Sequence, residues 1–351
     1  MSKPAPTRPT QAILFVLIVA CVGLVPLVLP GAFVVTLLIF VGIYVVVCTG
    51  LSLIFGFAGQ LSLTQAAFYG IGAYASALIT TRLAMPFWVG FLAAAALPAM
   101  VAFVIGVPIL RLRHFYLAMS TLAFSEIAAV MFIQEIEITG GPTGITHVPT
   151  PSLFGFRFDT PERYFYLVWV IALGVVLFSH NLIESRIGRA LRAISENEMA
   201  AGAMGVNVTA MKSLMFILSA VFAGIGGSLY AHFVSFVNPD PFAVSLSVLL
   251  VIMVAVGGVK SLWGAVLGAI FITVLPSFLG AYKQYSMLVY GLILVLVLMF
   301  LPDGIAGLVQ SLLRRLSGAP DPDDAPPADP APAVGTATPA AAPSDVTPGT
   351  R

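Results

Sequence analysis

The sequence predicts an all-α, polytopic membrane protein, a bundle of about ten transmembrane helices. Apolar residues make up 59% of its 351 residues and charged residues only 9%, against about 25% charged in an ordinary soluble domain. Between Arg8 and Arg82, 73 consecutive residues include no Asp, Glu, Lys or Arg. A soluble fold could not hide so much apolar surface, because its exterior requires charged side chains.

Ten apolar stretches approach the roughly 20 residues that a helix needs to cross a bilayer. They run over 11–29, 33–55, 59–80, 86–110, 115–134, 164–181, 211–233, 244–257, 263–281 and 285–301. The first stretch follows Lys3 and Arg8 and so looks like a signal peptide, but no small-residue cleavage site follows it. We therefore expect an uncleaved first helix after a short cytoplasmic segment, residues 1–10.

The distribution of Lys and Arg predicts that both termini are cytoplasmic. With ten crossings, twelve basic residues fall on the side of the N-terminus and four on the other side. Cytoplasmic loops are enriched in Lys and Arg, so the side with twelve is expected to be the cytoplasm. One transmembrane domain then covers 11–316, with a cytoplasmic loop at 182–210 and an outer loop at 135–163. Residues 317–351 contain nine prolines, which predicts a disordered tail.

Small residues recur at helical spacing inside two of the spans. Gly264 and Gly268 share one helix face, as do Ala220, Gly224 and Ser228. Such stripes let two helix backbones approach closely. They predict helix packing and carry no information on a substrate.

No pattern predicts catalysis, a metal site or a nucleotide site within this chain. The phosphate-loop pattern is missing, and the nearest match, at 257–261, joins two membrane spans instead of a strand and a helix. The four histidines lie far apart at span ends or in a loop, which favours interfacial or capping roles. A net charge of +1 argues against nucleic acid as a partner. We expect no catalytic residue, no metal ion and no cofactor bound by this chain.

Two polar features inside the spans are candidates for a translocation path. The first is Glu126, midway along 115–134, where a carboxylate is costly unless it faces a cavity or a partner. It either lines the path of a solute or is a hydrogen-bonded structural residue between helices.

The second feature is the start of the third span. Gly56 and Gly59 permit a break in the backbone at the membrane edge. The polar residues that follow are Gln60, Ser62, Thr64 and Gln65. A helix that begins inside the protein presents free N–H groups and the positive end of its dipole, which suit a passing carboxylate. The alternative is an ordinary glycine turn with Ser and Thr packed between helices.

The loop 182–210 contains a helix that is too short to cross the membrane. Ser195, with Glu198 three residues later, predicts a capping box that opens this helix, and Gly205 can end it. The helix is expected either to cover the bundle or to dock a cytoplasmic motor protein. The candidate docking residues are Ser195, Glu196, Asn197, Glu198, Ala200, Ala201 and Gly205.

In four segments the sequence resembles the permease subunits of bacterial ABC importers for branched-chain amino acids, in particular the longer of the two partner permeases. These segments are 50–74, 139–144, 188–207 and 257–268. One departure concerns the Gly-His pair that usually follows Leu-Ser-Leu in this family. This chain has Thr64-Gln65 there, so an importer of urea or short amides is the alternative.

The resemblance implies a multi-pass protein of the bacterial plasma (inner) membrane that carries the leucine, isoleucine and valine class of solutes by alternating access. Its implied partners are a second, different permease in a heterodimer, two cytoplasmic ATPases, a periplasmic or extracellular solute-binding protein, and membrane lipid. The segment Ser195–Gly205 matches the family's coupling helix, so the partner subunits would hydrolyse ATP and this chain is not expected to be an enzyme. From another class, an ion-coupled transporter working alone would need paired intramembrane charges, of which only Glu126 is present.

Overall fold

The computed structural model describes residues 31–110, 112, 115–153, 156–279, 291, 295, 299 and 304–308. All of them belong to the first of two units, Met1–Val309; the second unit, Gln310–Arg351, lies outside the described residues. The predicted segments 1–10, 11–29 and 317–351 also lie outside them, as do all but three residues of 285–301.

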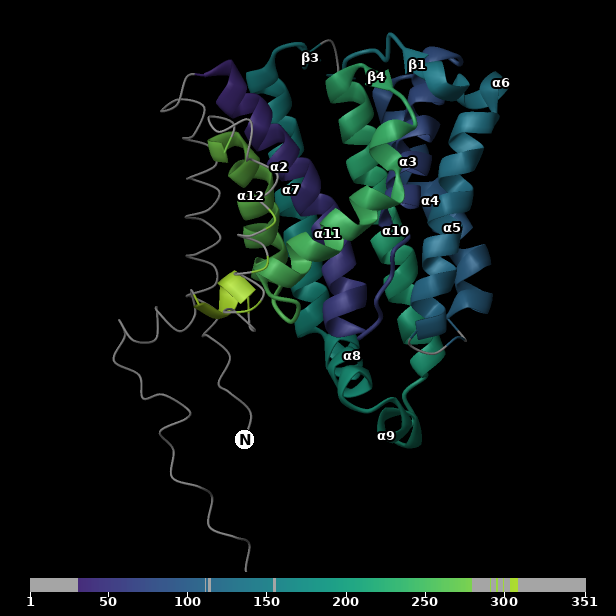
Figure 1. Cartoon of the computed structure of the whole chain (residues 1–351), viewed down its shortest axis with the longest axis vertical. Coiled ribbons are helices and arrows are strands. Elements are labelled where there is room, and N and C mark those ends of the chain that lie inside the picture. Colours follow the sequence, from purple (N-terminus) through teal and green to yellow (C-terminus); the bar gives the residue numbers. More distant parts are fainter. Residues whose placement is uncertain are drawn as a thin grey trace, which may run out of the picture. The chain divides into compact units, whose positions relative to one another are not determined.

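Helices account for nearly all of the regular structure in the described residues, which confirms the all-α class (Figure 1). The longer helices are α2 (Ala32–Ser52), α3 (Gln65–Thr81), α4 (Phe87–Ile109), α5 (Phe115–Gln134), α7 (Pro161–Glu184), α8 (Arg186–Glu196), α10 (Val208–Val234), α11 (Val244–Gly257) and α12 (Leu262–Leu279). The shorter ones are α6 (Ile136–Thr139), α9 (Glu198–Ala203), the π turn η1 (Leu53–Phe57), and the 3₁₀ turns η2 (Gly141–Thr143) and η3 (Asp240–Phe242).

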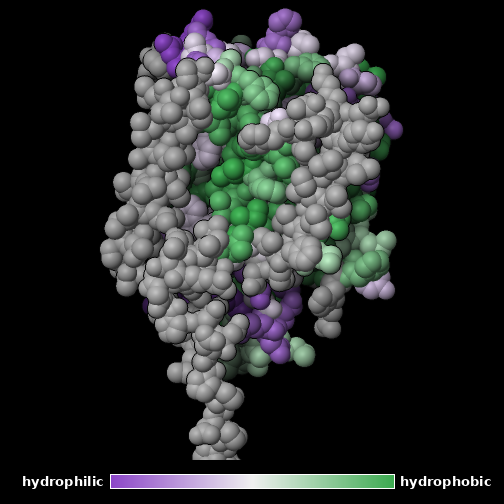
Figure 2. Space-filling model, turned by 60° about the vertical axis from the view of Figure 1, so that its left-hand side comes forward, coloured by the Kyte–Doolittle hydropathy of each residue, from purple (hydrophilic) through white to green (hydrophobic). Residues whose placement is uncertain are grey.

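Four two-residue strands form two short antiparallel pairs. β1 (Ile145–Thr146) pairs with β4 (Phe236–Val237), and β2 (Ser152–Leu153) pairs with β3 (Phe156–Arg157). They lie at one end of the helix bundle, and α8 and α9 lie at the other end (Figure 1). The loops predicted to be outer and cytoplasmic are therefore at opposite ends. Figure 2 shows apolar side chains over the middle of one face and hydrophilic ones toward both ends, as a membrane-spanning bundle requires.

The number of crossing helices is lower in the described residues than the sequence predicts. Five helices there are long and apolar enough to span a membrane: Ala32–Phe57, Phe87–Gly106, Phe115–Gln134, Pro161–Glu184 and Val208–Val234. They correspond to five of the eight spans predicted within these ranges. The other three, 59–80, 244–257 and 263–281, are not three separate straight crossings.

The physical reason is a sharp bend between two of these stretches and a non-helical start in the third. Helices α11 and α12 meet at an angle of 118° across a short break, so together they make one broken span or a re-entrant loop. In the predicted span 59–80, residues 59–64 are not helical, and the helix begins at Gln65. An apolar composition does not reveal such breaks.

The predicted small-residue stripes lie between helices, as expected. A Cβ atom at Gly224 would collide with the carbonyl of Ala94 in α4; next to the stripe, one at Gly227 would lie 2.8 Å from the backbone N of Ala73 in α3. In the second stripe, a Cβ atom at Gly264 would collide with the carbonyls of Gly257 and Gly258. Helix backbones therefore touch at both stripes, which confirms the predicted packing role.

At the end of the bundle that carries the strands, His232 joins α3 and α10 to the loop after β1. Its Nδ1 lies 2.7 Å from the carbonyl oxygen of Pro149, and its Nε2 lies 2.9 Å from Oγ of Ser76. A carbonyl can only accept, so Nδ1 donates to it. This buried histidine has the structural role that its position in the sequence favours.

We predict that Gly227→Ala destabilises the bundle by about 1–3 kcal/mol, since the added methyl group would push α10 off the backbone of α3. The measurement is the temperature at which the detergent-solubilised protein loses its monodisperse elution peak. Gly174→Ala in α7 is the matched control, because no atom lies within 4 Å of a Cβ placed there. An equal midpoint for both variants would contradict the close approach of α3 and α10.

Candidate functional site

The third predicted span begins with a segment that returns into the bundle in non-helical form. Helix α2 ends in the π turn η1, and Gly59 then adopts a left-handed conformation with φ of +67°. Residues 58–64 run back along the bundle to the start of α3 (Figure 1). The predicted path residues Gln60, Ser62, Thr64 and Gln65 are all buried. We call residues 58–64 the re-entrant segment.

Side chains of α5 satisfy the backbone of the re-entrant segment at Leu63. The N–H of Leu63 donates to Oγ1 of Thr121 at 3.2 Å, and the hydroxyl of Ser125 donates to the carbonyl of Leu63 at 2.6 Å. Within the segment, the hydroxyls of Ser62 and Thr64 are 2.9 Å apart. Non-helical backbone at membrane depth must be satisfied by protein or water, and α5 does so here.

Two further helices hold the first turn of α3. The N–H of Ala66 donates to Oγ of Ser247 in α11 at 2.9 Å. The amide Nε2 of Gln65 donates to Oγ of Ser219 in α10 at 2.5 Å. The start of α3 is therefore a meeting point of α5, α10 and α11.

Several polar groups at this meeting point have no partner among the described residues. They are the backbone N–H groups of Gln65 and Ala67 and the amide Oε1 atoms of Gln60 and Gln65. Buried polar groups are normally satisfied, so each exception needs an explanation. The free N–H groups can donate to an anion, and the free oxygens can accept from an ammonium or amide group.

The re-entrant segment also lies close to the loop predicted to be cytoplasmic. A Cβ atom at Gly59 would lie 3.8 Å from Cβ of Ser195 near the end of α8, and one at Gly56 would overlap the carbonyl of Val259, between α11 and α12. The structure thus brings a predicted docking residue, Ser195, against the start of the predicted path.

The predicted capping box at Ser195 is wrong. Ser195 lies inside α8, and its hydroxyl donates to the carbonyl of Arg192 at 2.9 Å. Asn197 caps α9 instead, because its Oδ1 accepts from the N–H groups of Met199 and Ala200, both at 3.0 Å. An Asn side chain reaches these donors as well as a Ser side chain does, and the continuous turns of α8 place Ser195 before the break.

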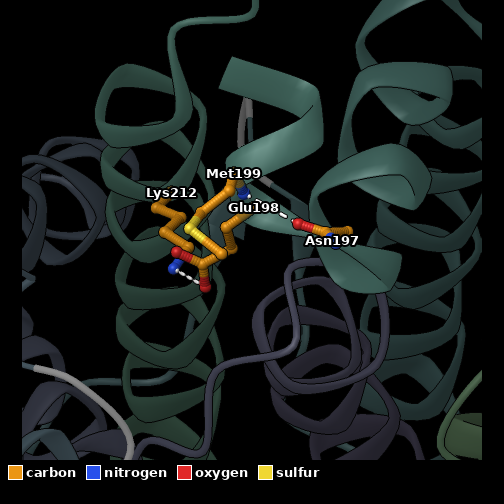
Figure 3. A network of polar contacts seen from close by, with 4 residues as sticks. All are labelled: Asn197, Glu198, Met199 and Lys212. Atoms are coloured by element: carbon orange, nitrogen blue, oxygen red, sulfur yellow. Dashed lines mark hydrogen bonds and ion pairs between the residues drawn. The ribbon is translucent and has the colours of Figure 1, made fainter. Parts of the chain in front are cut away.

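Glu198 has a different partner from the one that a capping box implies. Its carboxylate forms an ion pair with the ammonium group of Lys212 in the first turn of α10 (Figure 3). The Lys212 side chain is largely buried, whereas that of Glu198 is half exposed. This pair fastens the start of α9 to the start of α10.

The prediction that Gly205 ends the short helix is confirmed. Gly205 has a φ of +87°, and its N–H donates to the carbonyl of Gly202 at 3.0 Å. The N–H of Val206 donates to the carbonyl of Ala201 at 3.1 Å. These two bonds form a Schellman motif, which favours glycine at the left-handed position.

The surface of α9 is exposed and partly apolar. Ala201 is buried against the rest of the chain, whereas Met199 and Met204 are 84% and 86% exposed. Of the remaining predicted docking residues, Glu196, Asn197, Glu198, Ala200 and Gly205 are exposed. Large exposed apolar side chains rimmed by polar ones are typical of a contact surface. Ala201 therefore anchors α9 to the rest of the chain, and the exposed surface of α9 carries Met199 and Met204.

Glu126 lies apart from the other predicted path residues. It is exposed on α5, whose buried residues are Leu117, Thr121, Ser125, Ala128 and Phe132. No side chain in the described part of the chain forms an ion pair or hydrogen bond with it. Its neighbour Ser125 points the other way, to Leu63.

Sequence reasoning missed several residues of this site: Thr121, Ser125, Lys212, Ser219, Ser247, Met199 and Met204. The available signal was a small hydroxyl residue or a lysine inside an apolar helix. That signal is weak because such hydroxyls often bond only to their own helix.

Comparison with known proteins assigns this chain to a family. The family model described as "Branched-chain amino acid transport system / permease component" matches residues 33–298. The chain belongs to this permease family. It is a multi-pass membrane protein, and the match to the permease family runs from the second residue of α2 through α12.

Individual relatives of the chain are also named as permease proteins of branched-chain amino acid transport. The chain is 34% identical to the high-affinity branched-chain amino acid transport system permease protein LivM of Salmonella typhimurium over 299 residues, which cover 79% of this chain and 70% of that protein. It is 26% identical to the probable permease protein LivM of Methanocaldococcus jannaschii, over 77% of this chain and 92% of the relative. It is 25% identical to the permease protein LivH of Escherichia coli, over 75% and 91% of the two chains. No solved structure matches the chain.

We predict that Asn197→Ala loosens α9, because it removes the acceptor of two N–H groups at the start of the helix. The loss of such a cap costs about 1 kcal/mol, which corresponds to roughly fivefold faster hydrogen exchange of the amides in 198–203 if they exchange through local opening. Ser195→Ala is the matched control and should leave exchange in α9 unchanged. Faster exchange in α9 for Ser195→Ala than for Asn197→Ala would instead support the capping box that the sequence predicts.

Proposed function

We propose that this chain is a permease subunit of an ATP-driven importer for branched-chain amino acids of the leucine, isoleucine and valine class. It forms part of the translocation path together with a second, related permease. Separate cytoplasmic ATPases bind and hydrolyse ATP, and an external solute-binding protein delivers the solute. The chain binds no cofactor of its own. Its relatives named as permeases of branched-chain amino acid transport support this substrate class.

The observation that carries the proposal is the double connection between the exposed helix α9 and the start of α3. One connection is the close approach of Gly59 to Ser195 beside α9, where a Cβ atom added at Gly59 would lie 3.8 Å from Cβ of Ser195. The other runs from Glu198 through Lys212 along α10 to Ser219, which bonds to Gln65. A helix packs as a rigid element, so a displacement of α9 would be transmitted to both ends of the re-entrant segment.

This arrangement supports alternating access. The exposed methionines of α9 offer an apolar surface that suits a groove on an ATPase. Closure of the ATPases would move α9 and α10, and the bonds that hold the start of α3 would rearrange. In the conformation described here Ser62, Thr64 and Gln65 are buried, as expected of a closed path. The free N–H groups and amide oxygens suit the carboxylate and ammonium groups of an amino acid.

A second candidate is an importer of urea or a short amide. The unpartnered Oε1 atoms of Gln60 and Gln65 support it, because they can accept from amide N–H groups as well as from an ammonium group. The N–H groups of Gln65 and Ala67 favour the amino acid, whose carboxylate they can bind.

The deciding experiment is uptake into proteoliposomes that contain this chain with its neighbouring permease, ATPases and binding protein. We expect accumulation of labelled leucine that requires ATP, is inhibited by isoleucine and valine, and is insensitive to urea. Competition by urea but not by isoleucine would favour the second candidate. Accumulation by this chain alone, driven by an ion gradient, would overturn the proposal.

A variant of α9 tests the transmission of movement. Gly205→Glu should lower ATP-dependent uptake at least about tenfold, because a side chain at a φ of +87° is strained and distorts the end of α9. Membrane insertion should be retained, since nothing lies within 4 Å of a Cβ at this position. Thr209→Glu is the matched control: it adds the same charge to an exposed position in the first turn of α10, where an acidic residue is tolerated. Equal uptake by the two variants would argue against a coupling role of α9.

A further inference from the structure

The outward face of α5 combines two properties that conflict in lipid. Around Glu126, at spacings of four or seven residues, lie Met119, Leu122, Val130 and Ile133, all exposed. These side chains alone would suit a lipid-facing helix. Glu126 is the twelfth of the twenty residues of α5, so a membrane-spanning α5 places its carboxylate near the bilayer centre. A carboxylate there is rare and almost always faces protein or water.

The described part of this chain does not provide a partner for Glu126. Its described basic residues lie near helix ends or in loops, far in sequence from the middle of any span. The hydroxyl groups of α5 that reach inward, Thr121 and Ser125, bond to Leu63 and not to Glu126. The described part of this chain therefore leaves this face of α5 uncovered.

We propose that the exposed face of α5 is the contact surface for the second permease, and that Glu126 accepts a hydrogen bond from that subunit near the middle of the membrane. The inference rests on the proposed function, since it names the surface through which the proposed permease pair is joined. The facing helix is expected to be apolar, with a hydrogen-bond donor opposite Glu126.

Charge favours a different subunit over a second copy of this chain. A twofold contact between identical faces would bring two Glu126 carboxylates to the same seam, and like charges repel strongly in a medium of low dielectric constant. A related permease with a donor at this position meets no such penalty. Both kinds of relative, LivM and LivH, match this chain along most of its length, so two similar but non-identical bundles can pair.

The position of this surface gives it a role beyond assembly. Ser125 adjoins Glu126 in sequence and holds the carbonyl of Leu63 in the re-entrant segment. One face of α5 thus meets the second permease, and the other fixes the predicted path. A shift of the second permease would reach the re-entrant segment through a single helix.

The first test is site-specific photo-crosslinking in membranes that contain the assembled transporter. Benzoylphenylalanine replaces Val130, one turn after Glu126, or, as the control, Val170, which is 69% exposed on α7. We expect the probe at 130 to form an adduct with the second permease and the probe at 170 to form none. An adduct at 130 with another copy of this chain, or no protein adduct at 130, would overturn the proposal.

The second test compares Glu126→Leu with Glu126→Gln, with Val170→Leu as the control. We expect Glu126→Leu to reduce the amount of second permease that co-purifies by about three- to tenfold, as for the loss of one interhelical hydrogen bond, whereas Glu126→Gln keeps most of it. Leucine should leave insertion of this chain intact, because the exposed carboxylate has no partner within its described part. If the face met lipid, leucine would leave co-purification unchanged or raise it, and the proposal would fail.

These readouts do not depend on transport. If the pair forms through α5 but the liposomes accumulate no leucine, the substrate assignment fails and the interface stands. If leucine is accumulated but the probe at 130 captures no permease, the interface fails and the proposed function stands.

Discussion

Backbone that leaves the helical conformation inside a membrane must find hydrogen-bond partners in the protein or in water. The re-entrant segment 58–64 is under this constraint, and much of the surrounding polar chemistry follows from it. Thr121 and Ser125 of α5 satisfy Leu63, Ser247 of α11 satisfies Ala66, and the hydroxyl of Ser62 lies beside that of Thr64. Other buried polar side chains serve different contacts: Ser76 of α3, for example, bonds to Ser228 and His232 of α10.

The same constraint explains why distant parts of the chain can act together. Helix α10 approaches α3 closely at Gly227, so the two helices move as one unit. Its first turn binds Glu198 of α9 through Lys212, and Ser219, two turns further on, binds Gln65. The end of α8 lies close to Gly59, where an added Cβ atom would come within 3.8 Å of Cβ of Ser195. A helix that docks a motor and a segment that lines a path are therefore linked through rigid elements rather than through flexible loops.

The sequence predicted those features that depend on local patterns. Long apolar runs located five membrane helices, small residues at helical spacing located two close helix contacts, and Gly205 located the end of α9. It did not predict that the helix of the third span begins only at Gln65, nor the 118° bend between α11 and α12, because apolar composition is the same in a straight and in a broken span. It identified Gln60, Ser62, Thr64 and Gln65, but not Ser219 or Ser247, which lie more than 150 residues from their partners. The outward direction of Glu126 could not be read either, since α5 is apolar on all sides.

The most direct test of the account is the reactivity of a cysteine in the re-entrant segment of the assembled transporter. Ser62→Cys, in a chain whose Cys21 and Cys48 are replaced by Ala, puts a nearly isosteric thiol at a buried position. The account predicts that a membrane-impermeant thiol reagent labels this cysteine during ATP hydrolysis with solute present, and labels it far more slowly without nucleotide. Equal labelling in both states, or transport that proceeds while the cysteine is never labelled, would contradict the claim that the re-entrant segment is the moving part of the path.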